Sequence, residues 1–436
     1  MSRKKSTHEP MHYIRSELNL FDKEGYDMSI ISTQNNEYFP IAPLSDALAP
    51  LTFNVPSSMD HYVDLSRTRL YMRMSVTAGA GTALAATDIC PPVNNICHSA
   101  FTQCSVYLNG TQITPTSNLY AYRAYLERLL CTSKEFNKTQ ASLSGYFKET
   151  EPTTTDETGT DSYGKRNKWT AKSEVFEVLG RLHSDIFCSG YFLPPGVDLK
   201  VVLTRAPAAF CLFAKATGDF RLNIHEAKLQ VTKYKVQPQV SIGHIRTWES
   251  GEPVNIQMNR VDIKSYGLST GTQNSVNENL ITGELPSRIV VALVRANNVI
   301  GEITTNPFLF NGFNLTKIGM YVNSDVNECR ELDVHIDAKG ARIKEAVHNI
   351  YRSLGIDNQD CAIDFTEDDF LKSRALFVYD IAPTGQGIPP PRHGSIKIEL
   401  KFSAQTTHPI TVLVYTETPS TLHIDKAKNA YFASAA

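Results

Sequence analysis

Apolar and polar residues alternate with a period of two along much of the chain. The pattern is clear at 69–76, RLYMRMSV, and at 396–402, IKIELKF, where the lysines and the glutamate share one face. Such alternation is typical of strands with one buried face. Similar runs lie at 104–108, 176–182, 197–203, 288–294, 376–381 and 411–417. Because these runs are short and separated by Pro, Gly, Asn and Asp, they predict an all-β sandwich or barrel.

Within residues 220–236 the apolar phase changes once. Up to Ile224 the even-numbered positions are apolar, and from Ala227 the odd-numbered positions are apolar. One additional residue near Glu226 would produce this change. We therefore expect a β-bulge or a strand break there.

Two stretches have apolar residues three or four positions apart. The first is LYAYRAYLERLL at 119–130, and the second is EAVHNIYRSL at 345–354, followed by Gly355. Glycine is common just after the C-terminus of a helix. Since each stretch has one apolar stripe, we expect two helices that each lie against a sheet.

The order of these blocks repeats along the chain. Each half has strands, a helix, a polar segment, and then a proline-led alternating run: LPPGVDLKVVL at 193–203 and PPPRHGSIKIEL at 389–400. A repeated order of this kind predicts two copies of one unit. A linker is expected near 237–244, QPQVSIGH, where Pro and Gly interrupt the strand pattern. The expected parts are an N-terminal arm at 1–40, β-units at 41–237 and 238–418, and a C-terminal tail at 419–436.

Two polar segments are expected to be long exposed loops. Residues 149–168 are rich in threonine, and residues 269–283 are rich in Asn, Thr and Gly. Loops of this length in a compact domain are usually functional or mobile.

Charge narrows the classes of function. The 436 residues carry a formal net charge of -2, so no global basic field favours nucleic-acid binding. The local exception is Arg3, Lys4 and Lys5, which are either a solvated tail or a contact to phosphate. No apolar run typical of a secretory signal is found in residues 1–40, and no run is long enough for a transmembrane helix. We expect a soluble protein made in a reducing compartment.

The stretch 92–110, PVNNICHSAFTQCSVYLNG, raises the question of a metal or thiol site. Its cysteines belong to a series of three with six residues between neighbours, whereas zinc sites need close cysteine pairs. Cys97 and His98 are adjacent, so on a strand they would point to opposite faces. We expect free, mostly buried thiols and no metal site. The stretch is interpreted as a turn leading into a strand, with Asn109-Gly110 as the next turn.

No motif supports catalysis. The acidic run at 364–369, DFTEDD, lacks the spacing and the glycine of a calcium loop, so a solvated loop or a helix N-terminus is expected. The chain has no phosphate-binding loop, no nucleophile elbow and no His-Glu-x2-His helix. A pair of carboxylates acting on a sugar stays open, because such pairs come together only in three dimensions. The sequence predicts no catalytic residue and no cofactor.

Several blocks, taken in order, resemble the major capsid proteins of Polinton/Maverick elements and adintovirus-like viruses. The specificity of this resemblance lies in the joint order of the blocks, since none is a catalytic motif. In the first half they are LNLFDKE at 18–24, YVDL at 62–65, the stretch 92–110, SNLYAYRAYLERLL at 117–130, EVLGRLHSDIF at 177–187 and GVDLKVVLTRAPAAFCLF at 196–213. In the second half they are HNIYRSLG at 348–355 and SIKIEL at 395–400.

The resemblance implies an all-β double jelly-roll: two eight-stranded β-sandwiches with a few short inserted helices. It implies a non-enzymatic protein that forms pseudo-hexagonal homotrimers, which assemble with penton or minor capsid proteins into an icosahedral virion shell around double-stranded DNA. In the family the N-terminal arm lies toward the capsid interior, which would place Arg3, Lys4 and Lys5 near DNA. The threonine-rich segment 149–168 would then be a candidate for an outward tower.

Two other functions are compatible with a jelly-roll. One is a carbohydrate-binding or glycan-cleaving protein, since the same sandwich supports both activities. Such proteins are usually secreted, and the absence of a signal-like run in the first 40 residues counts against this function. The other is a minor or vertex capsid protein, generally built around a single jelly-roll. The duplicated length argues against it.

Overall fold

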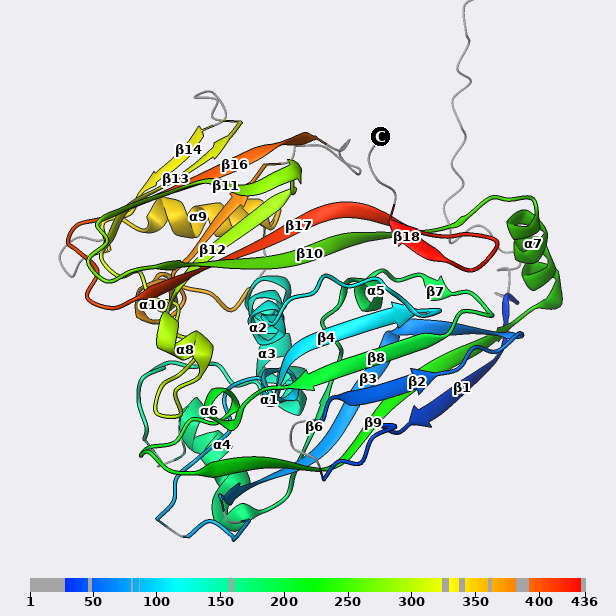
Figure 1. The fold of residues 1–436 in the computed structure, drawn as a ribbon, viewed down its shortest axis with the longest axis horizontal. Coiled ribbons are helices and arrows are strands. Elements are labelled where there is room, and N and C mark those ends of the chain that lie inside the picture. Colours follow the sequence, from blue (N-terminus) through cyan, green and yellow to red (C-terminus); the bar gives the residue numbers. More distant parts are fainter. Residues whose placement is uncertain are drawn as a thin grey trace, which may run out of the picture.

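The fold consists of two β-sandwiches side by side, with helices between them and at their ends (Figure 1). It is seen in a computed structural model. The model describes residues 28–45, 49–79, 81–85, 87–156, 159, 161–323, 329–336, 342–359, 363–381 and 392–432.

The first sandwich has sheets in the orders β1-β9-β3-β6, with β7 beside β3, and β2-β8-β4-β5. Its paired strands are antiparallel. Their bounds are β1 Ile30–Tyr38, β2 Leu51–Val55, β3 His61–Ala78, β4 Phe101–Leu108, β5 Thr111–Gln112, β6 Phe176–Gly180, β7 Phe192–Leu193, β8 Leu199–Arg205 and β9 Phe220–Val236.

The second sandwich has sheets in the orders β10-β17-β12-β15, with β18 beside β17, and β11-β16-β13-β14. Its pairs are also antiparallel. The bounds are β10 Val254–Leu268, β11 Asn274–Glu284, β12 Arg288–Arg295, β13 Leu315–Val322, β14 Cys329–Asp333, β15 Leu376–Asp380, β16 His393–Phe402, β17 Ile410–Ile424 and β18 Ala430–Phe432.

The two halves have the same topology. If the short additional strands β7 and β18 are set aside and the others are counted in chain order within each half, both halves have sheets in the orders 1-8-3-6 and 2-7-4-5. This is the strand order of a jelly-roll, two four-stranded sheets built from Greek keys. The prediction of two copies of one all-β unit is confirmed, and the fold is a double jelly-roll. Every strand run predicted from the alternation overlaps a strand.

The change of phase near Glu226 is a β-bulge. Arg73 pairs with Glu226 and Met74 pairs with Ile224, so His225 has no partner in the register of β3 and β9. The strand continues through the bulge. Ile224 and Ala227 are therefore both buried in the same core although one lies at an even and one at an odd position.

Ten α-helices occur in the part of the chain that the structure describes, and both predicted helices are among them. They are α1 Ile96–Ser99, α2 Tyr120–Cys131, α3 Lys134–Lys138, α4 Ser162–Thr170, α5 Asp185–Cys188, α6 Ala208–Cys211, α7 Pro238–Glu249, α8 Ala296–Ile300, α9 Lys344–Ser353 and α10 Glu367–Lys372. The predicted helices are α2 and α9, each between the fifth and sixth strands of its half. α2 differs from the expected one-sided helix, because it lies between the sandwiches and most of its residues are buried, including Arg123 and Arg128.

Two of the expected irregular segments are regular elements. The linker at 237–244 is part of α7, where Pro238 occupies the first turn, a position that needs no backbone N–H. The polar segment 269–283 contains most of β11, which pairs with β16 at the edge of its sheet. An edge strand with an exposed face needs few apolar residues. The prediction of a loop from the polar composition of this segment is therefore wrong.

The threonine-rich segment is a loop only in its first part, where residues 150–156 form no helix or strand and most of them are exposed or half-buried. Glu149, Tyr163 and Arg166 are buried, and the second part of the segment forms α4. Glu149 accepts a hydrogen bond from Asn306 of the second half, and the role of the segment as an outward tower stays a prediction.

Side chains of each half complete the hydrophobic core of the other. The core of the second sandwich includes the α2 side chains Tyr122, Tyr125, Leu126, Leu129 and Leu130, whereas Tyr120 belongs to the core of the first sandwich. In return, β10 and β17 extend from the second sandwich across the first one (Figure 1). The second-half residues in the core of the first sandwich are Ile256, Met258, Leu422, Ile424 and Ala430. The expected arm and tail are also partly regular. Residues 30–38 of the arm form β1, and residues 419–432 of the tail contain the end of β17 and the whole of β18.

The stretch 92–110 is a structural turn region, as predicted. It contains α1 and β4, and its next turn has positive φ at both Asn109 (46°) and Gly110 (83°). Positive φ at both central residues is the geometry of a tight hairpin turn that Asn-Gly favours.

Candidate functional site: a buried charge network between the sandwiches

Helix α2 joins the two sandwiches through aromatic rings. The rings of Tyr125 and Phe308 are stacked, with centroids 4.2 Å apart and an interplanar angle of 2°. Tyr122 packs edge-on against Phe308 and donates a hydrogen bond from its hydroxyl to the Pro307 carbonyl at 3.1 Å. Since Phe308 belongs to the second half, these contacts fix α2 against the second sandwich.

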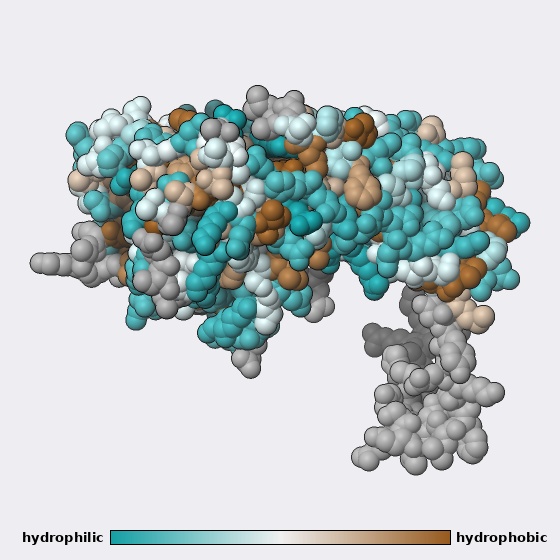
Figure 2. Space-filling view, turned by 90° about the horizontal axis from the view of Figure 1, so that it is seen from below, coloured by the Kyte–Doolittle hydropathy of each residue, from teal (hydrophilic) through white to brown (hydrophobic). Residues whose placement is uncertain are grey.

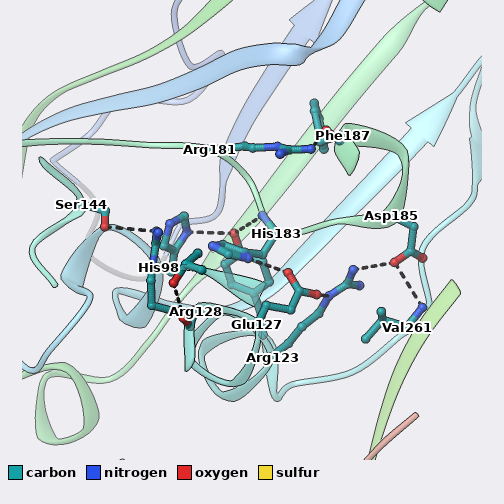
Figure 3. Close-up of polar contacts among 12 residues, drawn as sticks. His98, Arg123, Glu127, Arg128, Ser144, Arg181, His183, Asp185, Phe187 and Val261 are labelled. Atoms are coloured by element: carbon teal, nitrogen blue, oxygen red, sulfur yellow. Dashed lines mark hydrogen bonds and ion pairs between the residues drawn. The ribbon is translucent and has the colours of Figure 1, made fainter. Parts of the chain in front are cut away.

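Charged side chains of the same helix form a network at the junction (Figure 3). Arg123 lies between two carboxylates, with Nε 2.8 Å from Glu127 Oε1 and Nη2 2.5 Å from Asp185 Oδ1. The Asp185 carboxylate also accepts the Val261 backbone N–H of β10 at 3.2 Å. One buried guanidinium therefore connects α2, α5 and a strand of the second sandwich.

Two histidines extend the network into the first sandwich. His183 Nδ1 lies 2.6 Å from Glu127 Oε2. The His183 ring contacts the His98 ring edge-on, with centroids 4.6 Å apart, and His98 Nδ1 lies 3.1 Å from the Tyr120 hydroxyl. The side chain of His98 is fully enclosed here.

The environment fixes the protonation of these groups. Burial alone would raise the pKa of Glu127, but Arg123 and His183 outweigh it and lower the pKa to about 2. Burial lowers the pKa of His98 well below its ordinary value, and the nearby His183 and Arg128 lower it further. Burial also lowers the pKa of His183, against the opposing effect of Glu127. At neutral pH the glutamate is therefore ionised and both imidazoles are neutral.

The stability of the chain is expected to fall on acidification because of His98. The unfolded chain takes up a proton near the ordinary pKa of 6.5, whereas folded His98 stays neutral to lower pH. The contribution of neutral His98 to the free energy of unfolding is therefore fully present above about pH 6.5. Below that pH the free energy of unfolding falls, by at most about 1.4 kcal/mol per pH unit for one group. Urea unfolding between pH 7.5 and 5 measures the slope, and His98→Gln should reduce it. The exposed His348 is the control, and an equal effect of His348→Gln would contradict the assignment.

The network lacks an activated nucleophile among the described residues. A neutral histidine beside a carboxylate can act as a base, but burial raises the pKa of both Cys97 and Cys104 to about 12. Burial also raises the pKa of Tyr120 well above its ordinary value. No group of three or more metal-ligating side chains occurs in the described ranges. The geometry is suited to holding elements together.

A second buried pair lies in the threonine-rich segment. Arg166 Nη1 is 3.1 Å from Glu149 Oε1, and the Asn306 amide of the second half donates to Glu149 Oε2 at 3.0 Å. Sequence analysis missed this contact. The available signal was the presence of Glu149 and Arg166 in a segment that has hardly any aliphatic side chains.

The acidic run at 364–369 contributes a third contact between the halves. Thr366 and Asp369 form a capping box at the start of α10, which confirms the predicted helix N-terminus. Lys148 of the first half reaches Asp364 at 2.6 Å and Asp369 at 3.1 Å. The run is therefore partly buried at the interface and is not a solvated loop.

The remaining predicted site residues are placed as follows. Arg3, Lys4 and Lys5 lie outside the described residues, as does Cys361. The described cysteines are free, as expected. Cys90, Cys97, Cys104 and Cys211 are buried, Cys329 is half-buried, and Cys131 and Cys188 are exposed. No described helix combines the length and the hydropathy needed to cross a membrane.

Comparisons with known proteins place the whole chain in one structural class. No protein-family model matches it. An uncharacterized protein of Caenorhabditis elegans is 21% identical over 399 residues, which span 88% of this chain and 93% of the nematode protein.

Several solved structures from viruses share the fold. A chain of the Sputnik virophage has a TM-score of 0.65 at 9% identity, covering 100% of this chain and 95% of that chain. The mavirus major capsid protein has a TM-score of 0.55 at 11% identity, covering 100% and 96%. A chain of the PBCV-1 virus capsid has a TM-score of 0.56 at 9% identity, covering 95% and 100%. Each likeness extends over both sandwiches.

Proposed function

We propose that this chain is a non-enzymatic major capsid protein, which assembles as pseudo-hexagonal homotrimers into an icosahedral shell around double-stranded DNA. The observation that carries the proposal is the repeated jelly-roll order in both halves, shared over almost the full chain with the mavirus major capsid protein. Two similar units per chain give six similar corners in a trimer, which closes by three-fold symmetry. The joining helix α2 would hold the two units of each chain in fixed relation.

Assembly needs an exposed surface that a neighbouring copy can cover. Apolar residues gather on the end of the molecule that carries β1 and α7, at the right of Figure 2. β1 is the edge strand of its sheet, and Ile31 on it is exposed. α7 starts beside it, since Gln237 donates its N–H to the Ser29 carbonyl at 2.9 Å. On α7, Ile242 and Ile245 are 48% and 43% exposed. Exposed apolar patches of this kind mark interaction sites.

The proposal is tested by size-exclusion chromatography with light scattering on the purified chain, followed by electron microscopy. The expected result is a stable trimer that forms shells at high concentration. A protein that stays monomeric under all assembly conditions and binds glycans would instead support the carbohydrate-binding alternative.

The double substitution Ile242→Asp with Ile245→Asp is expected to raise the dissociation constant of the trimer at least ten-fold. The reason is that two exposed apolar side chains would be replaced by two charges that must lose water at the interface. Light scattering across a dilution series measures the change. Circular dichroism should be unchanged, because α7 has no buried residue. The control is Val276→Asp at an exposed apolar position of β11. Trimers as stable as those of the unsubstituted chain would exclude this end from the interface.

We propose further that the shell belongs to a Polinton/Maverick-type or adintovirus-like element. The match to a nematode protein over most of both chains supports an element carried in animal genomes. Penton or minor capsid proteins are the proposed partners, and the virion is the proposed location. Arg3, Lys4 and Lys5 would contact packaged DNA. Cleavage of the arm by a protease as fast in filled particles as in free subunits would contradict this role.

A further inference from the structure

A cleft beside the charge network has a lining that the assembly proposal does not use. It lies between the C-terminal end of α2, α3 and the segment from β6 to α5, and its volume is ≈ 450 Å³. Three arginines line it: Arg69 of β3, Arg128 of α2 and Arg181 after β6. The apolar part of the wall includes Phe136 and Leu143.

None of the three arginines forms an ion pair within 4.0 Å among the described residues. Arg69 donates to the Ser66 and Thr68 carbonyls, and Arg181 donates to the Phe187 carbonyl. Arg128 donates from Nη2 to the Ser144 hydroxyl at 3.4 Å and lies over the Phe136 ring. Within the part of the chain that the structure describes, the Nε atoms of Arg128 and Arg181 have no hydrogen-bond partner.

The burial of Arg128 makes this arrangement costly. Its exposed fraction is 6%, and burial lowers the pKa of its guanidinium. The carboxylate that lines the cleft is Glu127, which is already shared by Arg123 and His183. With three guanidiniums, one carboxylate and a neutral His183, the lining has a net charge of two positive units. A buried charge without a partner normally costs several kcal/mol.

We propose that this cleft binds an oxyanion of the phosphate class, held by Arg69, Arg128 and Arg181. A phosphate group carries about two negative charges at pH 7 and several acceptor oxygens. It therefore matches both the charge of the lining and the planar donor forks of guanidinium groups. A single carboxylate would neutralise only half of that charge. The source is either free phosphate or the phosphate chain of a nucleotide.

Binding is measured on the full chain by calorimetry and by thermal unfolding in inorganic phosphate, pyrophosphate or ATP, against potassium chloride at equal ionic strength. The expected result is a midpoint that rises with phosphate but not with chloride, since a ligand of the folded state stabilises it by mass action. Tighter binding of ATP than of pyrophosphate assigns the source to a nucleotide, and the reverse assigns it to free phosphates. Equal shifts in phosphate and chloride would overturn the proposal.

Variants locate the site. Arg128→Gln and Arg181→Gln are each expected to weaken binding at least ten-fold, whereas Arg73→Gln, on the same strand as Arg69 but half-exposed and outside the cleft, should not. Unaltered binding in both cleft variants would refute the site.

Thiol labelling tests the unsubstituted chain, so the result does not depend on how a variant folds. Cys131 and Cys188 line the cleft and are exposed, so phosphate should slow their reaction with a maleimide several-fold. Cys329 of β14 is the internal control and should react at the same rate with and without phosphate. If phosphate leaves the reaction rates of all three thiols unchanged, binding in this cleft is contradicted.

Discussion

Replacing Arg123 by methionine is expected to destabilise the folded chain by about 3–5 kcal/mol. The guanidinium is the shared partner of Glu127 and Asp185, and all three side chains are largely buried. Methionine fills a similar volume but leaves two carboxylates enclosed without their cation. The midpoint of urea unfolding, followed by circular dichroism, measures the loss.

The same experiment has a direct control in the carboxylates. Adding Asp185→Asn and Glu127→Gln to Arg123→Met removes both orphaned charges and should restore most of the lost stability, because neutral buried groups cost less than unpaired ions. Arg73→Met, at a half-exposed position, should change stability by no more than about 0.5 kcal/mol. A loss below about 1 kcal/mol for Arg123→Met would show that solvent or rearrangement compensates the charges.

Phe308→Ala is expected to cost about 3–5 kcal/mol, the second large effect. The ring is fully buried and stacked on Tyr125 of α2, so truncation leaves a cavity at the joint of the two sandwiches. We expect two unfolding transitions in place of one, since the packing that couples the halves is weakened. Differential scanning calorimetry resolves them.

Matched substitutions separate the joint from general destabilisation. Phe308→Leu keeps most of the volume and should retain one transition. Phe39→Ala also removes a phenyl ring, but at a position that is 60% exposed, so it should change the unfolding midpoint little. If the halves unfold together in Phe308→Ala, the remaining contacts between them, the charge network and the exchanged core residues, are sufficient to couple them.

The fold could be predicted from sequence to an unusual depth because strand periodicity, the phase change near Glu226 and the two helices are local signals. The repeat was visible for the same reason, since each half presents its helix and its proline-led strand in the same order. β11 was missed because an edge strand is held by backbone hydrogen bonds, which leave no apolar pattern. The helix α7 was missed because proline at the first helical turn and proline in a linker look alike in sequence.

For the candidate site, the sequence could predict only the state of the cysteines and not the charge network. The spacing of the cysteines correctly argued for free thiols, and most of those described are buried. The charge network was hidden because its members come from distant segments. Arg123 looks like the polar face of an ordinary helix, and Asp185 lies 62 residues away. Only the placement of α2 between two sandwiches, a tertiary fact, makes both side chains buried.

The exchange of core residues between the halves has a consequence for synthesis on the ribosome. The first sandwich cannot complete its core when its own last strand, β9, emerges, because Leu422, Ile424 and Ala430 are part of that core. Until those residues leave the exit tunnel, an apolar face of the nascent first unit stays open to chaperones and to other chains. The strands that cross between the sandwiches therefore delay the maturation of the first unit until residues 422–430 have been translated.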